Sequence, residues 1–256
     1  CSLPRMGNSL NSTMAGDKVR GDLLQGEERK RYVQSMFGQL APHYDLMNRL
    51  MSGWQDQKWR RALIHLIGLP HEARLLDLAT GTGDVAKLAL EHDSSAEVVG
   101  ADFSLQMMQI GKRTRWGSQV KWCGADALHL PFHAGTFDAV TSAYLLRNLP
   151  PESMVDGLRE QVRVVRAGGK IATLDATPPQ TGLFDPLVRF HLNVIIPTMG
   201  SLVAQQHEAF RYLSDSSQGF RSPTEIAECF HVAGLGEVTT RTFMFGTMTL
   251  VVGTKH

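Results

Sequence analysis

The sequence predicts an α/β domain built on a doubly wound, mostly parallel sheet of seven strands. Three observations support this. First, 256 residues allow one large domain or two small ones. Second, hydrophobic residues make up 43% and charged residues 20%, as in ordinary globular proteins. Third, short apolar runs alternate with helical patterns from residue 70 onward, as they do where helices cover both faces of a parallel sheet.

The sheet is preceded by a tail and a helical cap. Residues 1–25 are rich in Gly, Ser and Asn and show no apolar period, which predicts a mobile tail. Residues 26–70 place apolar side chains at helical spacing in three successive runs, which predicts a cap of three amphipathic helices. Residues 1–70 have a basic excess, for which a solvated face is favoured over contact with an anionic membrane.

The predicted strands and helices then alternate to residue 174. Strands are expected at 73–79, 97–101, 120–123, 137–143 and 170–174, with a turn at 167–169. Helices are expected at 85–90, 105–113 and 153–165. Residues 178–222 interrupt the pattern with many apolar residues and few charges, which predicts an inserted cover. A helix at 223–233 and strands at 236–244 and 247–253 end the chain, the two strands forming a hairpin that adds an antiparallel edge.

Charge and cysteine content exclude several classes of protein. A formal net charge of +1 argues against a dedicated nucleic-acid binder. The three cysteines lie far apart and form neither a disulfide framework nor a metal-binding pair. The sequence therefore predicts no bound metal and a reducing, cytoplasmic location. No apolar run approaches the roughly 20 residues that span a bilayer.

The glycine-rich segment 75–84, Leu-Leu-Asp-Leu-Ala-Thr-Gly-Thr-Gly-Asp, is the most informative part of the chain. It combines a buried strand, a tight turn and the start of a helix, and glycine there lets the backbone approach a ligand closely. Read as Gly81, Gly83 and Ala86, with Asp102 following, it also fits a dinucleotide fingerprint. The motif alone therefore leaves an NAD-dependent oxidoreductase open.

Three acidic residues favour a different cofactor. Asp77 lies inside the strand before the turn, where a carboxylate suits a cationic ligand better than a pyrophosphate. Asp102 ends the second strand, where it can accept both ribose hydroxyls, and Asp126 follows the third strand, where it can read an adenine amino group. Each acid alone could be a helix cap or a loop residue. Together they fit a nucleoside with a positively charged amino-acid tail, as in S-adenosylmethionine.

Further segments of the chain resemble the class I methyltransferases that C-methylate the quinone ring in menaquinone and ubiquinone biosynthesis. The matching segments run nearly end to end from about residue 31. They include Tyr44-Asp45-Leu46-Met47-Asn48, the glycine loop, Ala125-Asp126-Ala127, Leu146-Arg147-Asn148 and Gly200-Ser201-Leu202-Val203-Ala204. The glycine loop marks only the superfamily, whereas the first and fourth segments are specific to the quinone branch. The resemblance implies the Rossmann-like class I fold, with S-adenosylmethionine as cofactor and a prenylated quinol as substrate.

The resemblance implies cofactor contacts from Thr82, Asp102, Asp126 and Ala127, and the complete predicted set is Asp77, Ala79, Gly81, Thr82, Gly83, Asp102, Phe103, Asp126, Ala127 and Ala143. The sequence departs from the family pattern in three places. Ala143 stands where relatives often have serine, Leu174-Asp175-Ala176 stands where they have Leu-Glu-Phe, and Phe210 stands where they often have tyrosine. These changes lie toward the substrate side.

The implied reaction, attack of a quinol ring carbon on a sulfonium methyl group, predicts the catalytic candidates. A phenol with a pKa of about 10 is ionised in only about one molecule in a thousand at pH 7. Arg147 stays charged at any working pH, so it can bind the oxyanion or polarise a water but cannot be the base itself. The candidates are Arg147, Asn148, His207, Tyr212 and Asp215.

Demethylmenaquinol is the first expected substrate, with a ubiquinone-type benzoquinol or another small lipophilic acceptor as the alternative. A non-catalytic scaffold that binds the cofactor only structurally is a third class. Nucleic acid is not expected as a partner. Reversible contact with a membrane surface is expected, and the sequence leaves open whether the protein forms a homodimer.

Overall fold

The structure, a computed structural model, describes residues 34–38, 40–42, 44–178 and 220–256. Its sheet has seven strands in the order β3-β2-β1-β4-β5-β7-β6. Their bounds are β1 (Arg74–Leu78), β2 (Glu97–Asp102), β3 (Val120–Gly124), β4 (Phe137–Ala143), β5 (Val165–Ala176), β6 (Leu235–Phe243) and β7 (Met248–Lys255). Strands β1 to β5 pair in parallel, and β7 is antiparallel to both neighbours. The predicted doubly wound, mostly parallel sheet is confirmed.

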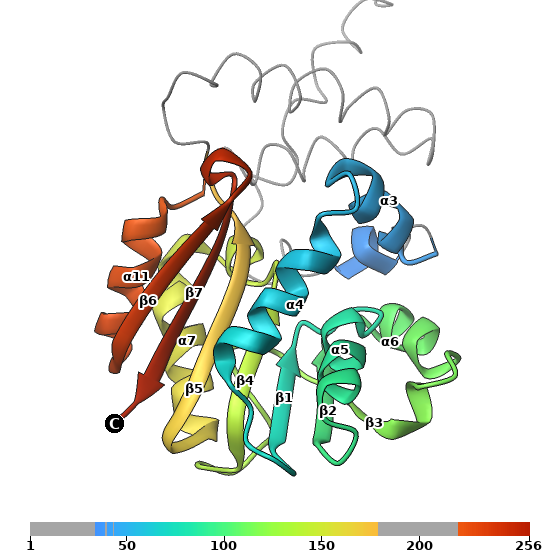
Figure 1. Ribbon diagram of the computed structural model, residues 1–256, viewed down its shortest axis with the longest axis horizontal. Coiled ribbons are helices and arrows are strands. Elements are labelled where there is room, and N and C mark those ends of the chain that lie inside the picture. Colours follow the sequence, from blue (N-terminus) through green and yellow to red (C-terminus); the bar gives the residue numbers. More distant parts are fainter. Residues whose placement is uncertain (1–33, 39, 43, 179–219) are drawn as a thin grey trace, which may run out of the picture.

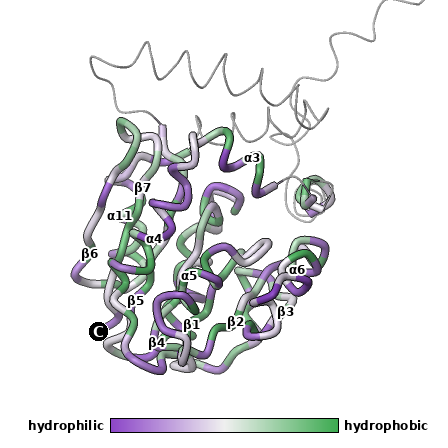
Figure 2. The backbone as a smooth tube through the Cα atoms, turned by 45° about the vertical axis from the view of Figure 1, so that its right-hand side comes forward, coloured by the Kyte–Doolittle hydropathy of each residue, from purple (hydrophilic) through white to green (hydrophobic). Residues whose placement is uncertain are grey.

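Helices cover both faces of this sheet (Figure 1). The described helices are α3 (Tyr44–Met51), α4 (Asp56–Ile67), α5 (Asp84–His92), α6 (Leu105–Lys112), α7 (Met154–Val164) and α11 (Pro223–Val232). Helices α4 and α5 lie in front of the sheet in the view of Figure 1, and α7 and α11 lie behind it. Hydrophobic and hydrophilic residues alternate along these helices (Figure 2), as expected for helices that bury one side. Buried residues of α4, α5, α7 and α11 pack in the same clusters as residues of the strands, whereas those of α3 pack within the cap and against Met107 of α6.

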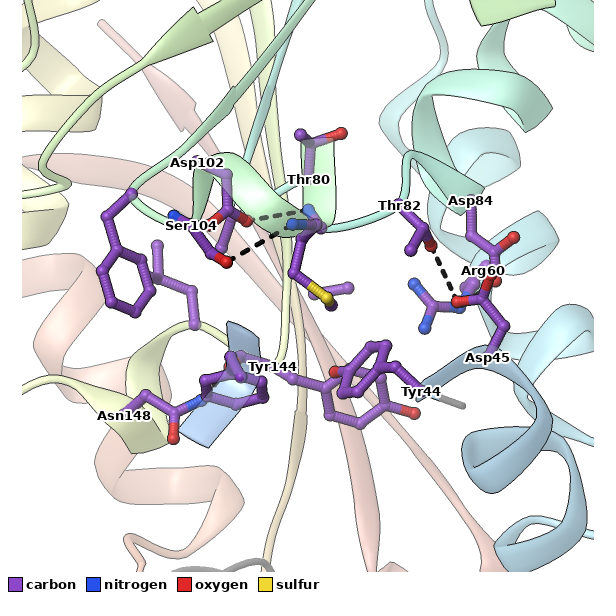
Figure 3. A pocket seen from close by; sticks show the side chains of 17 residues that line it. Tyr44, Asp45, Arg60, Thr80, Thr82, Asp84, Asp102, Ser104, Tyr144 and Asn148 are labelled. Carbon is purple, nitrogen blue, oxygen red and sulfur yellow. Dashed lines mark hydrogen bonds and ion pairs between the residues drawn. The ribbon is translucent and has the colours of Figure 1, made fainter. Parts of the chain in front are cut away.

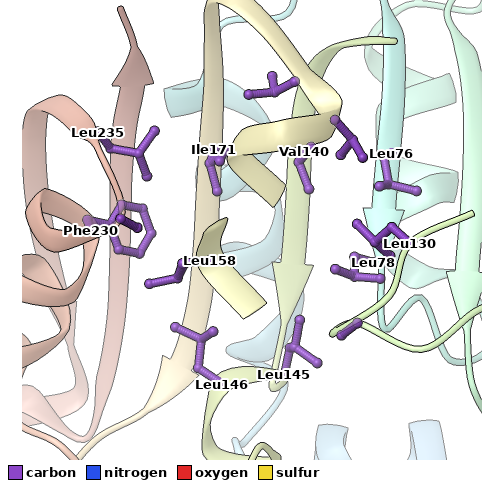
Figure 4. Close-up of a cluster of buried hydrophobic side chains, with 14 of the residues drawn as sticks. Leu76, Leu78, Leu130, Val140, Leu145, Leu146, Leu158, Ile171, Phe230 and Leu235 are labelled. Atoms are coloured by element: carbon purple, nitrogen blue, oxygen red, sulfur yellow. The ribbon is translucent and has the colours of Figure 1, made fainter. Parts of the chain in front are cut away.

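Successive residues of the inner strands supply two separate cores. Leu76 and Val140 pack toward α7 and α11 in the cluster of Figure 4. Their chain neighbours Leu75 and Ala139 pack on the opposite face, with residues of α4 and α5. Side chains alternate across a strand, so apolar runs such as Leu75-Leu76 are what a strand buried on both faces requires.

Strand β5 begins earlier than the sequence predicts, at Val165 rather than at residue 170. The predicted turn residues lie within it, as an irregularity in the pairing with β4. Phe137 pairs with Val165, and the next pair is Ala139 with Lys170, so the intervening residues form a bulge. Gly168 lies there with φ of +74°, a backbone conformation that glycine adopts without strain.

The predicted C-terminal hairpin is present, but its two strands do not follow their chain order at the edge of the sheet. Strand β7, the last in the chain, inserts between β5 and β6, so the antiparallel strand lies one place inside the edge. Burial explains this order. The first six residues of β7 are all buried, whereas most of β6 is exposed or half-buried, so the more apolar strand takes the inner position.

The strand order places a crevice beyond the carboxyl ends of β1 and β4. From β1 the chain continues outward to β2 and β3, and it later returns to the other side of β1 as β4. Open α/β sheets bind ligands at such a switch in strand order. Helix α3 of the predicted cap lies beyond this end of the sheet (Figure 1). No helix in the described part of the chain is long and apolar enough to cross a membrane.

Candidate active site

The glycine turn leads from β1 into α5 through a series of left-handed backbone conformations. Ala79, Gly81 and Gly83 have φ values of +56°, +58° and +89°. Gly83 is the N-cap of α5, and a Cβ there would lie 2.5 Å from Trp116, so the position also lacks room for a side chain. The turn therefore brings bare backbone to the cavity at the crevice.

Asp77 stabilises this turn from beneath. Its Oδ2 accepts hydrogen bonds from the Thr80 hydroxyl at 2.6 Å and from the Ala86 N–H at 3.2 Å, and its Oδ1 accepts one from the Thr141 hydroxyl at 3.1 Å. Burial raises the pKa of Asp77 to about 6, against the lowering effect of these donors. The side chain is fully buried and does not line the cavity. Its carboxylate ties strand, turn and helix together, whereas the sequence suggested that it faces a cationic ligand.

Asp102 lies where the sequence places it, at the carboxyl end of β2 and on the cavity. One carboxylate oxygen accepts the Gly81 N–H at 2.8 Å, and the other accepts the Ser104 N–H at 2.7 Å. Burial raises the pKa of Asp102 to about 6, although these two N–H groups lower it. Each carboxylate oxygen has two lone pairs, so Asp102 retains acceptor capacity for a pair of ligand hydroxyls.

The cavity contains about 550 Å³ of space that no protein atom fills, part of it open to solvent. Figure 3 shows its polar groups in two sets, with Asp102 and Ser104 on one side and Asp45, Arg60, Thr82 and Asp84 on the other. It is lined by Phe37, Tyr44, Asp45, Arg60, Ala79, Thr80, Gly81, Thr82, Asp84, Asp102, Phe103, Ser104, Met107, Ala143, Tyr144, Leu145 and Asn148. Seven predicted residues are therefore brought together: Ala79, Gly81, Thr82, Asp102, Phe103, Ala143 and Asn148.

Other predicted cofactor contacts lie off the cavity. Ala127 is buried in the core cluster on the α7 and α11 side. Asp126 is partly exposed, and its Oδ1 accepts the Leu128 N–H at 3.1 Å. Gly83 acts through the backbone of the turn, as described above. His207, Tyr212 and Asp215, with the predicted tail and almost all of the predicted cover, lie outside the described residues.

Several cavity residues from the cap were missed by the sequence reasoning. The Thr82 hydroxyl donates a hydrogen bond to Asp45 Oδ1 at 2.7 Å, and Tyr44 and Arg60 also line the space. Tyr44 and Asp45 belong to a segment that the resemblance singled out, which was the available signal for them. Arg60 carried no such signal, because nothing local distinguishes it from Arg61 beside it.

Arg147 lies immediately outside the lining residues, in a buried pair with Asp175. Its Nε is 4.0 Å from Asp175 Oδ1, and Asp175 Oδ2 accepts the Leu146 N–H at 2.9 Å. Burial raises the pKa of Asp175 to about 7, even though the Arg147 charge lowers it. The Arg147 guanidinium lies 5.1 Å from the centroid of the Tyr144 ring. Asn148 donates to the Tyr144 carbonyl at 2.6 Å, which holds this short turn in shape.

The sheet order, the glycine turn and the acid at the end of β2 define a class I methyltransferase. Solved structures share this fold at low sequence identity. One is a chain in the complex of the Haloferax volcanii Trm112 methyltransferase activator and a putative methyltransferase, with a TM-score of 0.60 and 16% identity over 85% of this chain and 98% of that one. Another is human N-acetylserotonin methyltransferase, with a TM-score of 0.58 and 15% identity over 82% of this chain and 55% of that one.

The chain belongs to the ubiE/COQ5 methyltransferase family, whose model matches residues 25–255. It is 41% identical over 223 residues to the Ubiquinone/menaquinone biosynthesis C-methyltransferase UbiE of Desulfotalea psychrophila, covering 87% of this chain and 90% of that protein. It is 39% identical to the Demethylmenaquinone methyltransferase of Thermus thermophilus, covering 86% of this chain and all of that protein. The predicted family, fold and enzyme class are confirmed.

Proposed function

We propose that this enzyme transfers a methyl group from S-adenosylmethionine to a ring carbon of a demethylated prenyl-quinol, with demethylmenaquinol as its substrate. Family membership and the printed activities of the two relatives support the reaction. The observation that carries the proposal is the cavity itself, in which the glycine turn, Asp102 and Asn148 meet at the carboxyl ends of the parallel strands. Naphthoquinol is preferred over benzoquinol because relatives across several organisms bear the name demethylmenaquinone methyltransferase.

The residues present fit the proposed cofactor. Asp102 offers acceptors for the ribose hydroxyls, and the bare backbone from Ala79 to Gly81 allows close approach. Apolar side chains, among them Phe103, Met107 and Leu145, complete the walls. When bound, S-adenosylmethionine supplies an electrophilic methyl group on a sulfonium.

The protein's own residues contribute to the reaction by stabilising charge on the quinol and by excluding water from the cavity. A dry cavity favours a reaction in which the opposite charges of phenolate and sulfonium are lost. Arg147 can stabilise the quinol oxyanion because its guanidinium stays charged and presents a fork of donors. Asp175 holds the turn that carries Arg147 through its bond from the Leu146 N–H. The residues of the predicted cover, including Tyr212, are proposed to meet the substrate.

The experiment that tests the proposal is methyl transfer from labelled S-adenosylmethionine to demethylmenaquinol and to a demethylated benzoquinol, side by side. Mass analysis of each product identifies the methylated position. We expect the naphthoquinol to be methylated faster and the Asp102→Ala variant to lose most activity with both. No methylation of either quinol would overturn the proposal, and a faster benzoquinol would reassign the substrate. Equilibrium binding measurements with S-adenosylhomocysteine and with NAD distinguish a methyltransferase, which should bind the first, from an NAD-dependent oxidoreductase, which should bind the second.

Delivery of an insoluble prenyl substrate requires the enzyme to meet a membrane surface, and we propose that it does so reversibly. The basic excess of residues 1–70 supports an electrostatic component. At low salt the enzyme should sediment together with anionic vesicles. Added salt should weaken this binding because it screens the charges. Equal recovery with neutral vesicles would contradict the electrostatic component.

A further inference from the structure

Tyr144 lines the cavity in a backbone conformation that is unfavourable for a residue with a large side chain. It directly follows strand β4, and its φ is +61°. Figure 3 shows its ring among the side chains of the cavity wall. A bulky residue is rare in this left-handed region, whereas glycine adopts it without strain. An aromatic side chain at this point therefore needs an explanation beyond the local backbone.

Hydrogen bonds on both sides of Tyr144 hold this conformation. Its N–H donates to the Leu174 carbonyl of β5 at 2.7 Å, and its carbonyl accepts from the Asn148 side chain at 2.6 Å. Asn148 belongs to the short turn Leu146–Asn148, which also carries Arg147. The sheet and this turn therefore fix the backbone from which the Tyr144 ring projects.

Two guanidinium groups lie over the ring of Tyr144. Cζ of Arg147 is 5.1 Å from the ring centroid and Cζ of Arg60 is 5.3 Å from it, and both distances are within the range of a cation–π contact. The side chains of the two arginines are only 6% and 7% exposed. A cation–π contact is stronger when the cation is removed from water, so this ring contributes to the position of both charges.

Tyr144 acts on Arg147 through its ring and not as an ionised phenol. Burial raises the pKa of Tyr144 to about 12, although the Arg60 and Arg147 charges lower it. The hydroxyl therefore stays protonated at any working pH. A second contact to the same guanidinium comes from β5, where Asp175 Oδ1 lies 4.0 Å from Arg147 Nε.

We propose that Tyr144 is a positioning residue for Arg147, whose guanidinium its ring holds at the cavity wall, within reach of the quinol oxyanion. The inference rests on the proposed function, because it assumes that Arg147 stabilises that oxyanion. The turn that carries Arg147 has only three residues, so it needs further contacts to orient a long side chain. The ring on one strand and the Asp175 carboxylate on the next supply those contacts, which explains an aromatic residue in a left-handed conformation.

Turnover of two variants of the full chain tests the role of the ring. Tyr144→Leu removes the ring and keeps a branched apolar side chain, whereas Tyr144→Phe keeps the ring and removes only the hydroxyl. At pH 7, with S-adenosylmethionine and demethylmenaquinol saturating, Tyr144→Leu should slow methyl transfer about 3- to 30-fold, the effect of losing a buried cation–π contact. Tyr144→Phe should stay within about twofold of the parent.

A double-mutant cycle with Arg147→Gln distinguishes positioning from a structural role. If Tyr144 acts through the Arg147 charge, adding Tyr144→Leu to Arg147→Gln should slow turnover no further, whereas independent effects would multiply. Raising the pH should recover part of the loss in Tyr144→Leu, because the quinol then ionises without help from the charge. Asp175 is the same in all these variants, so its titration does not separate them.

Phe243→Leu is the matched control. Phe243 is another partly buried aromatic residue of the same core cluster, with Arg241 Cζ 5.2 Å from its ring centroid, and it does not line the cavity. This variant should keep the turnover and the pH–rate profile of the parent. Thermal unfolding and the affinity for S-adenosylhomocysteine check the fold and the cofactor site of each variant.

A fluorinated ring keeps the test decisive if Tyr144→Leu does not fold. Phenylalanine and its fluorinated derivatives at position 144 have nearly the same shape, but each added fluorine weakens the negative face of the ring. Turnover at pH 7 should therefore fall with each fluorine. The same series in Arg147→Gln should show no such trend.

The outcomes separate this inference from the proposed function. No methylation by the parent would overturn the proposed function. Methylation by the parent, with Tyr144→Leu as active as the parent or with equal losses in Tyr144→Leu and Tyr144→Phe, would overturn only the role of the ring. Multiplied losses in the double variant, an equal loss in Phe243→Leu, or turnover that is insensitive to fluorination would overturn that role as well.

Discussion

The hydroxyl of Thr82 donates a 2.7 Å hydrogen bond to Asp45, which joins the glycine turn to helix α3 of the cap. The two residues are 37 positions apart in the chain. Because both line the cavity, this bond holds the cap against the same turn that is proposed to contact the cofactor. Closure of the cap and binding of the cofactor are therefore expected to depend on each other.

Thr82→Val tests this dependence with a side chain of similar shape that lacks the donor. It leaves the Asp45 carboxylate without its hydroxyl partner, so affinity for S-adenosylhomocysteine should fall about tenfold or more, in line with 1.5–3 kcal/mol for a bond to a charged group. Calorimetry measures the change. Thr136→Val removes an exposed hydroxyl bond far from the cavity and should leave the affinity as in the parent. Equal affinities for all three proteins would show that the bond is only structural.

Asp102 makes a prediction about pH. Ligand hydroxyls donate to its ionised form, whereas burial raises the pKa of Asp102 to about 6 in the free protein. The affinity for S-adenosylhomocysteine should therefore decline as the pH falls through 6, because binding must then expel a proton. Asp102→Ala should reduce the affinity by one to two orders of magnitude at pH 8 and remove this decline. A decline below pH 6 that persists in Asp102→Ala would assign it to another group.

The buried carboxyl of Asp175 should make the parent less stable at high pH. Burial raises the pKa of Asp175 to about 7, above the value of about 3.9 in an unfolded chain. Between these values the native state holds a proton that the unfolded state releases, so the free energy of unfolding falls as the pH rises from 4 to 7.

Asp175→Asn keeps the shape and the acceptor for the Leu146 N–H but cannot ionise. In urea unfolding, the free energy of unfolding of Asp175→Asn should be close to that of the parent at pH 4. At pH 8 it should exceed the parent's by an amount on the order of a few kcal/mol. Asp156→Asn, in an exposed pair with Arg159, should show no such divergence. Parallel curves for parent and Asp175→Asn would mean that Asp175 is ionised throughout.

The fold could be predicted from the sequence because its signals are local. Runs such as Leu75-Leu76 and Val98-Val99, each followed by a helical pattern, are required wherever strands are buried on both faces. The place of β7 inside the edge is not local, since it depends on which strand of the hairpin buries more apolar surface against β5. The bulge in β5 was missed for a different reason, because glycine is typical of both a turn and a bulge.

The candidate site divides in the same way. Asp102 and the glycine turn were predicted because strand ends and tight turns follow directly from the chain. Arg60 was missed because its contact with the cavity arises only when the cap packs on the sheet. Asp77 was predicted at the site and lies beneath it instead, because the hydroxyls of Thr80 and Thr141 satisfy its carboxylate within the core.

Arg147 makes the last prediction, which concerns chemistry rather than binding. If its charge stabilises the quinol oxyanion, lowering the hydroxyl pKa by two units would raise the phenolate fraction about a hundredfold at neutral pH. Arg147→Gln should therefore slow methyl transfer by about that factor, and raising the pH should recover part of the loss by ionising the quinol directly. Arg147→Lys should recover less than its charge suggests, because lysine lacks the planar fork.

The variants are expected to fold, because losing the Arg147 charge favours the neutral form of Asp175, whose raised pKa already makes protonation easy. The measurement is a pH–rate profile of both variants at saturating S-adenosylmethionine, with S-adenosylhomocysteine affinity measured in parallel. Since Arg147 does not line the cavity, that affinity should match the parent's within a few-fold. A loss confined to cofactor affinity, or a profile that lies below the parent's by a constant factor at every pH, would make Arg147 a structural residue. A rate that approaches the parent's as the quinol ionises would instead place the Arg147 charge on the oxyanion.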